Sequence, residues 1–260
     1  MICAGIDAGS RTIKVVLLES DTLAVIAADT MDQGVEQDAL AMRLLERLLQ
    51  QNGLRRGDVH TIVATGYGRK LITTADATVT EITCQGCGVR QRMPQARTVV
   101  DIGGQDSKLV RLHPDGAVAD FVMNDRCAAG TGRFLEVLAT RLGVKLGSLG
   151  TLAGKSQSPA IISNMCVVFA ETEIVGLLAS GIGPEDIVAG VQASIATRVA
   201  AMAGRKVGSP VVFTGGVALV PGMDDALESA LEEPVTIAPD PQITGALGAA
   251  ILAARRASDR

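Results

Sequence analysis

Two segments of this 260-residue chain combine an aspartate, glycines and a lysine within a short turn. In the first, residues 7–14 (the Asp7 turn), Asp7 ends an apolar run and is followed by Gly9, Ser10, Arg11 and Lys14. Backbone N–H groups in such a turn can bind phosphate oxygens, and the carboxylate can hold a hydrated Mg²⁺ ion. Taken alone, the Asp7 turn fits a simple β-hairpin turn equally well.

The second segment, residues 101–108 (the Asp101 turn), repeats this design. Asp101 ends another apolar run and is followed by Gly103, Gly104, Gln105 and Lys108. Two such turns, each opening one half of the chain, favour a nucleotide site over two unrelated hairpins.

A third segment, residues 214–217 (the adenosine segment), reads Thr214, Gly215, Gly216 and Val217 after an apolar run. Its glycines would let the backbone approach a flat adenine or a ribose closely. In this order the three segments resemble the phosphate-1, phosphate-2 and adenosine motifs of the actin/Hsp70/sugar-kinase superfamily.

Two of the five cysteines suggest ligands for a metal or cluster. Cys127 precedes Gly130, Thr131 and Gly132 (the glycine segment) at the entry to a predicted helix, and Cys166 precedes another predicted helix. A helix N-terminus favours a thiolate, the form that binds metal. A [4Fe–4S] cluster usually takes four thiolates, so two per chain would require a twofold dimer with one cluster per dimer.

The other three cysteines leave alternatives open. Cys84 and Cys87 form a C-x-x-C pair, which could add two ligands within one chain or act as a redox pair. Cys3 lies in the first predicted strand and is most simply a core residue. Cys127 and Cys166 could each instead be a small buried side chain.

The elements that must position these residues follow from the apolar periodicity. The first half predicts strands at 2–7, 13–18, 23–28 and 59–64 and helices at 35–50 and 80–91. The second half predicts strands at 98–102, 107–112, 117–123 and 210–213 and helices at 133–142, 167–180, 184–205 and 244–255. The stretch 160–182 is expected to be a loop that runs into a buried helix. The order of elements occurs roughly twice, which predicts a duplicated two-lobed α/β fold with lobes at 1–95, joined by the C-terminal helix 243–260, and at 96–242.

Composition excludes several classes of function. The net charge is only −4, so nonspecific nucleic-acid binding is not expected. Aromatic residues make up 2% of the chain, which predicts a core of Ala, Val, Ile and Leu. The start of the chain has no secretory signal pattern and the 160–182 stretch is interrupted by polar residues, so we expect a cytoplasmic protein without a membrane span.

Three longer segments make the resemblance specific. Asp101-Ile-Gly-Gly-Gln-Asp, Asn124-Asp-Arg-Cys-Ala-Ala-Gly-Thr-Gly-Arg-Phe and Cys166-Val-Val-Phe-Ala-Glu resemble the activator ATPases of 2-hydroxyacyl-CoA dehydratases and the related ATPase subunits of benzoyl-CoA reductase, the BadF/BadG/BcrA/BcrD type. The likeness extends over essentially the whole chain, including Ala64-Thr-Gly-Tyr-Gly-Arg69 and Gly245-Ala-Leu-Gly-Ala-Ala250. Cys87 departs from the family pattern.

The resemblance implies an actin-like (ribonuclease H-like) ATPase that binds ATP or ADP with Mg²⁺. It also implies a homodimer whose Cys127 and Cys166 hold one shared [4Fe–4S] cluster. ATP would close the two lobes and let the cluster pass one electron to a 2-hydroxyacyl-CoA dehydratase or an aromatic acyl-CoA reductase, with ferredoxin or flavodoxin as the electron source. Asp7 and Asp101 would place Mg²⁺, and Gln105 is the candidate for orienting the attacking water.

Two other interpretations remain open. One is a small-molecule kinase of the same fold, although no sugar-binding set is evident between the two turns and the paired cysteines would have no use. The other is a non-catalytic, nucleotide-dependent binding module or sensor.

Overall fold

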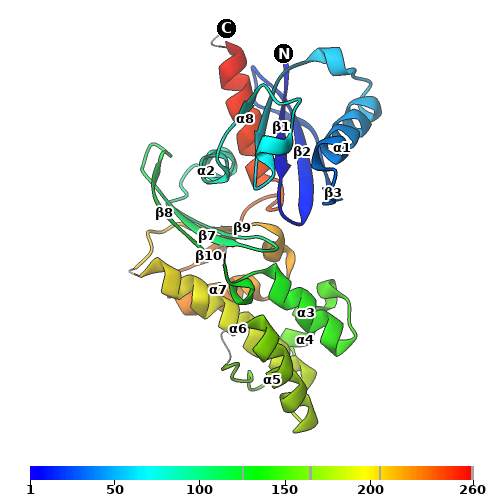
Figure 1. Ribbon diagram of the computed structural model, residues 1–260. Helices are drawn as coiled ribbons and strands as arrows, with labels where there is room; N and C mark the ends of the chain where they lie inside the picture. Colours follow the sequence, from blue (N-terminus) through cyan, green and yellow to red (C-terminus); the bar gives the residue numbers. More distant parts are fainter. Residues whose placement is uncertain (125, 164–165, 205, 259–260) are drawn as a thin grey trace. The chain divides into compact units, whose positions relative to one another are not determined.

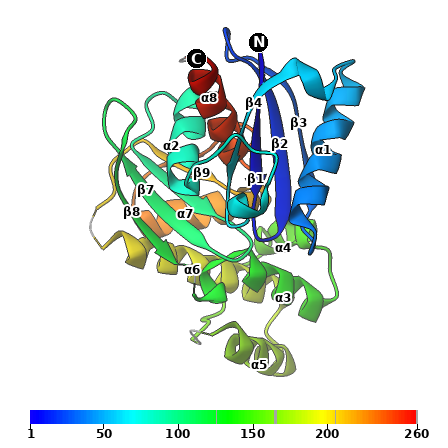
Figure 2. The same cartoon turned by 45° about the horizontal axis from the view of Figure 1, so that its top comes forward.

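The computed structural model describes residues 1–124, 126–163, 166–204 and 206–258 (Figures 1 and 2). Contacts divide the chain into two units. The first comprises Met1–Ala96, Leu112–Ala119 and Ala238–Arg260, and the second comprises Arg97–Arg111 and Asp120–Ile237.

The first unit contains a five-stranded sheet in the order β3-β2-β1-β4-β5. Its strands are β1 (Ile2–Ala8), β2 (Thr12–Glu19), β3 (Val25–Asp32), β4 (Val59–Thr65) and β5 (Ala77–Thr78). β1 pairs antiparallel with β2 and parallel with β4. The predicted opening hairpin and the next two predicted strands are confirmed, whereas the two-residue strand β5 was not predicted.

Helices cover both faces of this sheet (Figure 1). They are α1 (Gln37–Gln51), α2 (Glu81–Arg92) and α8 (Thr244–Ser258), all three at predicted positions. The leucine stripe of α1 joins Ala4 and Ile6 in one apolar cluster, while α8 joins Cys3 in the cluster on the opposite face. This alternation follows from the two-residue period of a strand. At Gly5 a Cβ would lie 2.0 Å from Ala246 O, so only glycine lets α8 approach β1 this closely.

The second sheet has the order β10-β9-β6-β7-β8. Its strands are β6 (Thr98–Ile102), β7 (Ser107–Leu112), β8 (Val118–Asn124), β9 (Val211–Thr214) and β10 (Val235–Ile237). β6 pairs antiparallel with β7 and parallel with β9, as β1 does with β2 and β4. The two sheets thus have the same strand order, which confirms the predicted duplicated α/β fold of actin-like type.

The helices of the second unit are α3 (Gly132–Leu142), α4 (Leu149–Ala153), α5 (Val167–Ala179), α6 (Pro184–Ala203) and α7 (Met223–Leu231). α6 ends on Gly204, whose φ of +61° suits a glycine cap. The predicted last residue of that helix, Arg205, lies outside the described residues. α4, α7 and β10 were not predicted.

One prediction about α5 is wrong. The loop and helix in the 160–182 stretch are present, but the helix is not buried, because Val168, Phe169 and Val175 are 67%, 66% and 48% exposed. Figures 1 and 2 both show α5 at the end of the second unit farthest from its sheet. Apolar composition predicted burial, but only Val167, Ala170 and Ile174 of this helix are buried, and Leu177 and Leu178 pack against the core while partly exposed.

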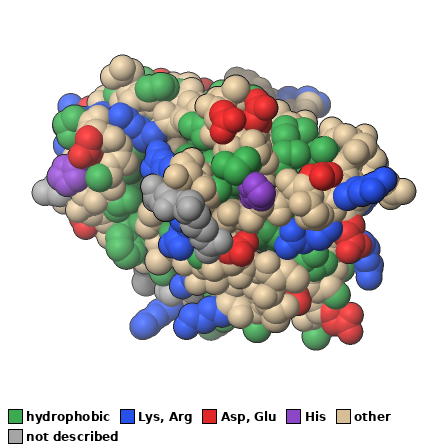
Figure 3. Space-filling view, turned by 90° about the horizontal axis from the view of Figure 1, so that it is seen from above, with side chains coloured by type: hydrophobic (Ala, Val, Ile, Leu, Met, Phe, Trp, Pro, Cys, Tyr) green, Lys and Arg blue, Asp and Glu red, His purple; other side chains and the backbone are tan. Residues whose placement is uncertain are grey.

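On the face drawn in Figure 3, acidic and basic side chains are scattered among apolar and neutral ones, in keeping with the small net charge. Across the described residues, no helix combines the length and apolar composition that crossing a membrane requires.

Candidate functional site

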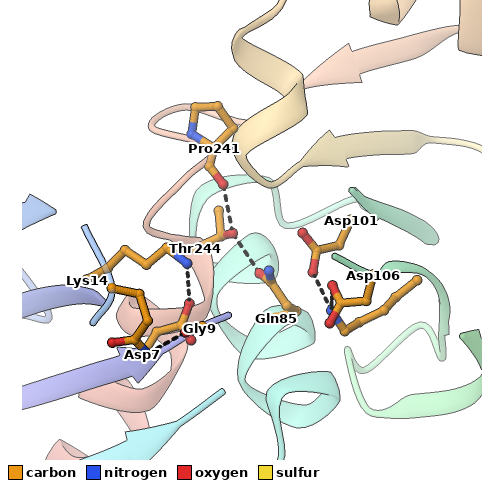
Figure 4. A network of polar contacts seen from close by, with 10 residues as sticks. Asp7, Gly9, Lys14, Gln85, Asp101, Asp106, Pro241 and Thr244 are labelled. Carbon is orange, nitrogen blue, oxygen red and sulfur yellow. Dashed lines mark hydrogen bonds and ion pairs between the residues drawn. The ribbon is translucent and has the colours of Figure 1, made fainter. Parts of the chain in front are cut away.

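The Asp7 turn joins β1 to β2 in the first unit. Strand register places Asp7 opposite Lys14, and Lys14 Nζ lies 3.1 Å from Asp7 Oδ2 (Figure 4). Gly9 N donates to Thr12 O at 3.1 Å, and a Cβ at Gly9 would lie 2.9 Å from Lys14 Nζ. The turn therefore holds a half-buried acid–base pair beside a glycine that has no side chain to block access.

Two further glycines of the first unit pack on the Asp7 carboxylate. Gly66 has a φ of +86°, and a Cβ there would lie 2.3 Å from Asp7 Oδ1. Gly245, in the first turn of α8, would place a Cβ 3.3 Å from Asp7 Oδ2. The segments Ala64–Arg69 and Gly245–Ala250, singled out in the sequence for their likeness to a family, therefore both contact the Asp7 carboxylate.

Sequence reasoning missed two polar residues next to this carboxylate. Thr244 Oγ1 donates to Gln85 Oε1 at 2.6 Å, and both side chains are buried (Figure 4). The two residues lie 159 positions apart, so no local pattern could have paired them. The one available signal was a glutamine placed among the small residues Cys84, Gly86, Cys87 and Gly88.

The Asp101 turn joins β6 to β7 in the second unit and has a similar construction. Lys108 Nζ lies 2.7 Å from Asp106 Oδ1 and 3.4 Å from Asp101 Oδ2 (Figure 4). Lys108 is only 3% exposed, so its charge requires these partners. Two carboxylates around one ammonium leave a net negative charge, which suits a divalent cation. Gln105 is exposed at the tip of this turn.

The glycine segment and the adenosine segment both contact the Asp101 turn. Gly132 N donates to Gly103 O at 2.9 Å, and Thr131 Oγ1 donates to Gly104 O at 3.2 Å. A Cβ at Gly132 would lie 3.1 Å from Val217 Cγ2.

Gly215 makes the closest of these contacts, because a Cβ there would lie 2.5 Å from Asp101 Oδ1. In the second unit, the glycine segment and the adenosine segment thus both pack on the Asp101 turn, and Gly215 lies beside the Asp101 carboxylate itself. Gly130, Thr214 and Gly216 lie within these segments, whereas Ser10 and Arg11 lie in the Asp7 turn of the first unit.

Cys127 and Cys166 both lie in the second unit. Cys127 N donates to Asn124 Oδ1 at 3.1 Å and Cys127 O accepts from Asn124 Nδ2 at 2.9 Å, just before the 3₁₀ turn Ala128–Gly130. Cys166 is exposed and directly precedes α5, where its carbonyl accepts from Ala170 N at 2.8 Å. Of the two cysteine motifs, Asp125, Asn164 and Met165 lie outside the described residues.

The remaining cysteines are buried more deeply. Cys84 and Cys3 are fully buried, and Cys87 is half-buried. Burial raises the pKa of the Cys84 thiol to about 12, with a smaller opposing effect from the Thr65 hydroxyl, and burial also raises the pKa of Cys87. In the ligand-free chain, burial therefore favours the protonated form of both thiols.

Comparison with known proteins identifies the family. Residues 4–253 match the family model described as the BadF/BadG/BcrA/BcrD ATPase family. The chain is a member of the BadF/BadG/BcrA/BcrD ATPase family. It is therefore an ATPase, and the resemblance stated from its sequence is confirmed.

Relatives of this BadF/BadG/BcrA/BcrD ATPase include named activators. The chain is 42% identical over 254 residues to the activator of lactoyl-CoA dehydratase of Anaerotignum propionicum, covering 97% of each chain. It is 33% identical to one of the subunits of benzoyl-CoA reductase from Thauera aromatica, covering 98% of this chain and 94% of that one. Among solved structures, the activator of the 2-hydroxyisocaproyl-CoA dehydratase from Clostridium difficile with bound ADPNP superposes with a TM-score of 0.94 at 39% identity, covering 100% and 96% of the two chains.

Proposed function

We propose that this ATPase is an ATP-dependent one-electron donor that activates a 2-hydroxyacyl-CoA dehydratase through a [4Fe–4S] cluster shared by two copies of the chain. The observation that carries the proposal is the placement of Cys127 and Cys166. Each directly precedes a helical turn in the unit that holds the Asp101 turn. The names of relatives that span the same length support the choice of a dehydratase as the partner.

The nucleotide is proposed to bind through the Asp7 turn, the Asp101 turn and the adenosine segment. Lys14 and Lys108 would offset phosphate charge, and the glycines would let backbone N–H groups reach phosphate oxygens. Asp7 and Asp101 would orient hydrated Mg²⁺, which supplies charge stabilisation for phosphoryl transfer. Gln105, exposed at its turn, stays our candidate for orienting the attacking water.

A chain of contacts within the second unit connects the Asp101 turn to both cysteines. Near its start, α3 is tied to the turn by the hydrogen bond from Arg133 N to Gly104 O at 2.9 Å. Near its end, Arg141 of α3 forms an ion pair with Glu171 of α5, the helix that begins after Cys166. A change in the turn on ATP binding would therefore reach Cys166 through α3 and α5, and ATP would shift the population by binding one of the two states more tightly.

The exposed face of α5 supports the homodimer. Val168 and Phe169 lie two and three residues after Cys166 and are both about two-thirds exposed, and Val175 lies two turns further along the same helix. Apolar side chains exposed beside a ligand mark a surface that is covered by another chain. Two thiolates per chain then give the four that one [4Fe–4S] cluster takes, and the cluster would supply the one-electron carrier.

A second candidate partner is an aromatic acyl-CoA reductase, which the likeness to one of the benzoyl-CoA reductase subunits favours. Ferredoxin or flavodoxin is the proposed electron source. A small-molecule kinase of this fold is less well supported, because it would give the paired cysteines no role.

Iron analysis tests the cluster. We expect anaerobically purified protein to carry about four irons per dimer, and Cys127→Ser and Cys166→Ser to lose the cluster while the buried control Cys3→Ser keeps it. Four irons per monomer, or a full cluster spectrum in either ligand variant, would overturn this ligand assignment.

Removal of iron by a chelator tests the coupling to ATP. Mg-ATP should change the rate at which a chelator bleaches the unmutated protein, because linkage between the two sites is reciprocal. Asp101→Ala should retain its cluster, lose about 10² or more in ATPase rate, and lose the nucleotide effect if binding is lost. Equal bleaching rates with and without saturating Mg-ATP would remove the main support for an ATP-gated donor.

A further inference from the structure

Gln85 is a buried amide that no step of the proposed mechanism uses. It lies in α2 and is 8% exposed, and its Oε1 accepts from Thr244 Oγ1, which also contacts Pro241 O at 3.2 Å. Among the described residues, none accepts a hydrogen bond from Gln85 Nε2. Because Nε2 itself is not a fully buried atom, it is accessible from outside the chain and can donate to a ligand there.

The backbones of α2 and α8 lie close together on both sides of Gln85. A Cβ at Gly88 of α2 would lie 1.9 Å from Thr244 O, and one at Gly248 of α8 would lie 1.8 Å from Cys84 O. The two helices therefore meet backbone against backbone on both sides of Gln85. Such contacts set the position of its carboxamide before any ligand arrives, which lowers the entropy cost of using it.

Gln85 and Asp7 flank the same space beside Gly245. The point where a Gly245 Cβ would lie is 3.3 Å from Asp7 Oδ2 and 3.7 Å from Gln85 Cδ. Figure 4 shows Gln85 held by Thr244 in the same unit as the Asp7–Lys14 pair. Because Thr244 occupies the amide oxygen, the Nε2 donor is the group that remains for a ligand, and a donor matches an anionic oxygen.

We propose that Gln85 is a further nucleotide-contacting residue, whose Nε2 donates a hydrogen bond to a phosphate oxygen held at the Asp7 turn. The inference rests on the proposed role of that turn in nucleotide binding. Asp7 can meet a phosphate only through a cation, whereas Gln85 provides a neutral donor beside the same space. Its contribution is therefore independent of Mg²⁺.

Two substitutions separate this contact from a structural role. Gln85→Glu keeps an oxygen for Thr244 and nearly the same volume, but replaces the Nε2 donor with an anionic oxygen. Gln85→Leu removes both the donor and the Thr244 bond without adding charge. A phosphate contact predicts that Gln85→Glu binds ADP most weakly, whereas a structural role predicts that Gln85→Leu is the more damaged protein and Gln85→Glu stays close to the unmutated one.

The experiment is calorimetric titration of the full-length, anaerobically purified protein with ADP in excess EDTA, and separately with Mg-ADP and adenosine. We expect ADP affinity to fall about tenfold to 100-fold in Gln85→Glu and about tenfold in Gln85→Leu, with adenosine affinity unchanged in both. Thr244→Val, which keeps the donor but removes its anchor, should lose less. Gln192→Leu, which removes a buried glutamine already bonded to Pro221 O at 3.0 Å, serves as the matched control and should bind ADP as the unmutated protein does.

The outcomes distinguish the two proposals. If the unmutated protein binds no ADP, the proposed nucleotide site fails. If it binds ADP and Gln85→Glu retains full affinity, or if adenosine binding falls in parallel with ADP binding, the role of Gln85 is overturned while the nucleotide site stands. Thermal melts of each variant check that the compared proteins are folded.

Discussion

A single methyl group at Gly215 tests the geometry of the second unit more sharply than removal of a carboxylate would. Gly215 has φ +89° and ψ 175°, a combination that is essentially restricted to glycine. A Cβ there would lie 2.4 Å from Ile102 O and 2.5 Å from Asp101 Oδ1. Gly215→Ala therefore forces both the adenosine segment and the Asp101 carboxylate to move.

The expected loss of stability and of activity in Gly215→Ala follows from these contacts. The backbone strain costs about 1–3 kcal/mol and the overpacking a similar amount, and because the Asp101 side chain can rotate away we expect about 3 kcal/mol in total. For a chain of this length that lowers the melting midpoint by roughly 6–12 °C. Displacing a metal-positioning carboxylate by about 1 Å costs on the order of 10² in rate, so ATPase activity should fall by about that factor.

The assay is the ATPase rate at saturating Mg-ATP, measured well below the melting midpoint of each variant. Gly181→Ala is the matched control, since its φ is +85° but a Cβ there meets nothing within 4 Å. It should lose stability from the backbone alone and keep its ATPase rate. If folded Gly215→Ala hydrolyses ATP at the unmutated rate, the placement of the Asp101 carboxylate beside the adenosine segment is not needed for the reaction.

Three further predictions concern the thiols, the helix contact and the coupling. The pKa of the buried Cys84 thiol is about 12 in the folded protein, against an ordinary value of 9. The protonated thiol therefore contributes its full share to the free energy of unfolding below pH 9. Between pH 9 and pH 12 this contribution falls by about 1.4 kcal/mol per pH unit. Urea titrations at pH 8–11 should show that Cys84→Ala lacks this part of the slope, and equal slopes would contradict the burial argument. Gly88→Ala should lower the free energy of unfolding by about 3 kcal/mol or prevent folding, because its Cβ would meet the backbone of the neighbouring helix. Gly86→Ala is the control and should be less destabilised, because its Cβ meets only side chains, at 3.2 Å and 3.4 Å. Similar stabilities of the two variants would refute this prediction. Arg141→Met removes the ion pair with Glu171 and should keep the iron content and the ATPase rate, but it should reduce the effect of Mg-ATP on the rate of iron removal by a chelator. Arg141→Lys should show an intermediate effect. An unchanged effect of Mg-ATP in Arg141→Met would exclude coupling through the contact between α3 and α5.

Much of the local structure was predictable from the sequence. Strand-ending aspartates followed by glycines, as at Asp7 and Asp101, predicted two hairpins, and both lie where expected. These features depend on neighbours in the chain, such as the register that pairs Asp101 with Lys108, so spacing alone was enough. Cys166 at the start of α5 was predicted for the same reason.

Exposure was less predictable than secondary structure. The stretch 160–182 is strongly apolar, and burial of its helix was the natural expectation. Val168 and Phe169 are nevertheless exposed, because which face of a helix meets the core depends on elements distant in the sequence. α7 was missed although Met223, Leu227 and Leu231 repeat at helical spacing, because the helix is only nine residues long.

By itself, the sequence determined the family resemblance, the two turns and the cysteine pair, because each is carried by residue types at short spacing. Only the tertiary structure decided that Gly215 contacts the Asp101 carboxylate and that Thr244 meets Gln85. These contacts join segments more than 100 residues apart, and they exist because the parallel pairing of β6 with β9 and the glycine-mediated approach of α2 to α8 bring those segments together. No spacing rule along the chain records such pairings, since they are set by how whole strands and helices pack.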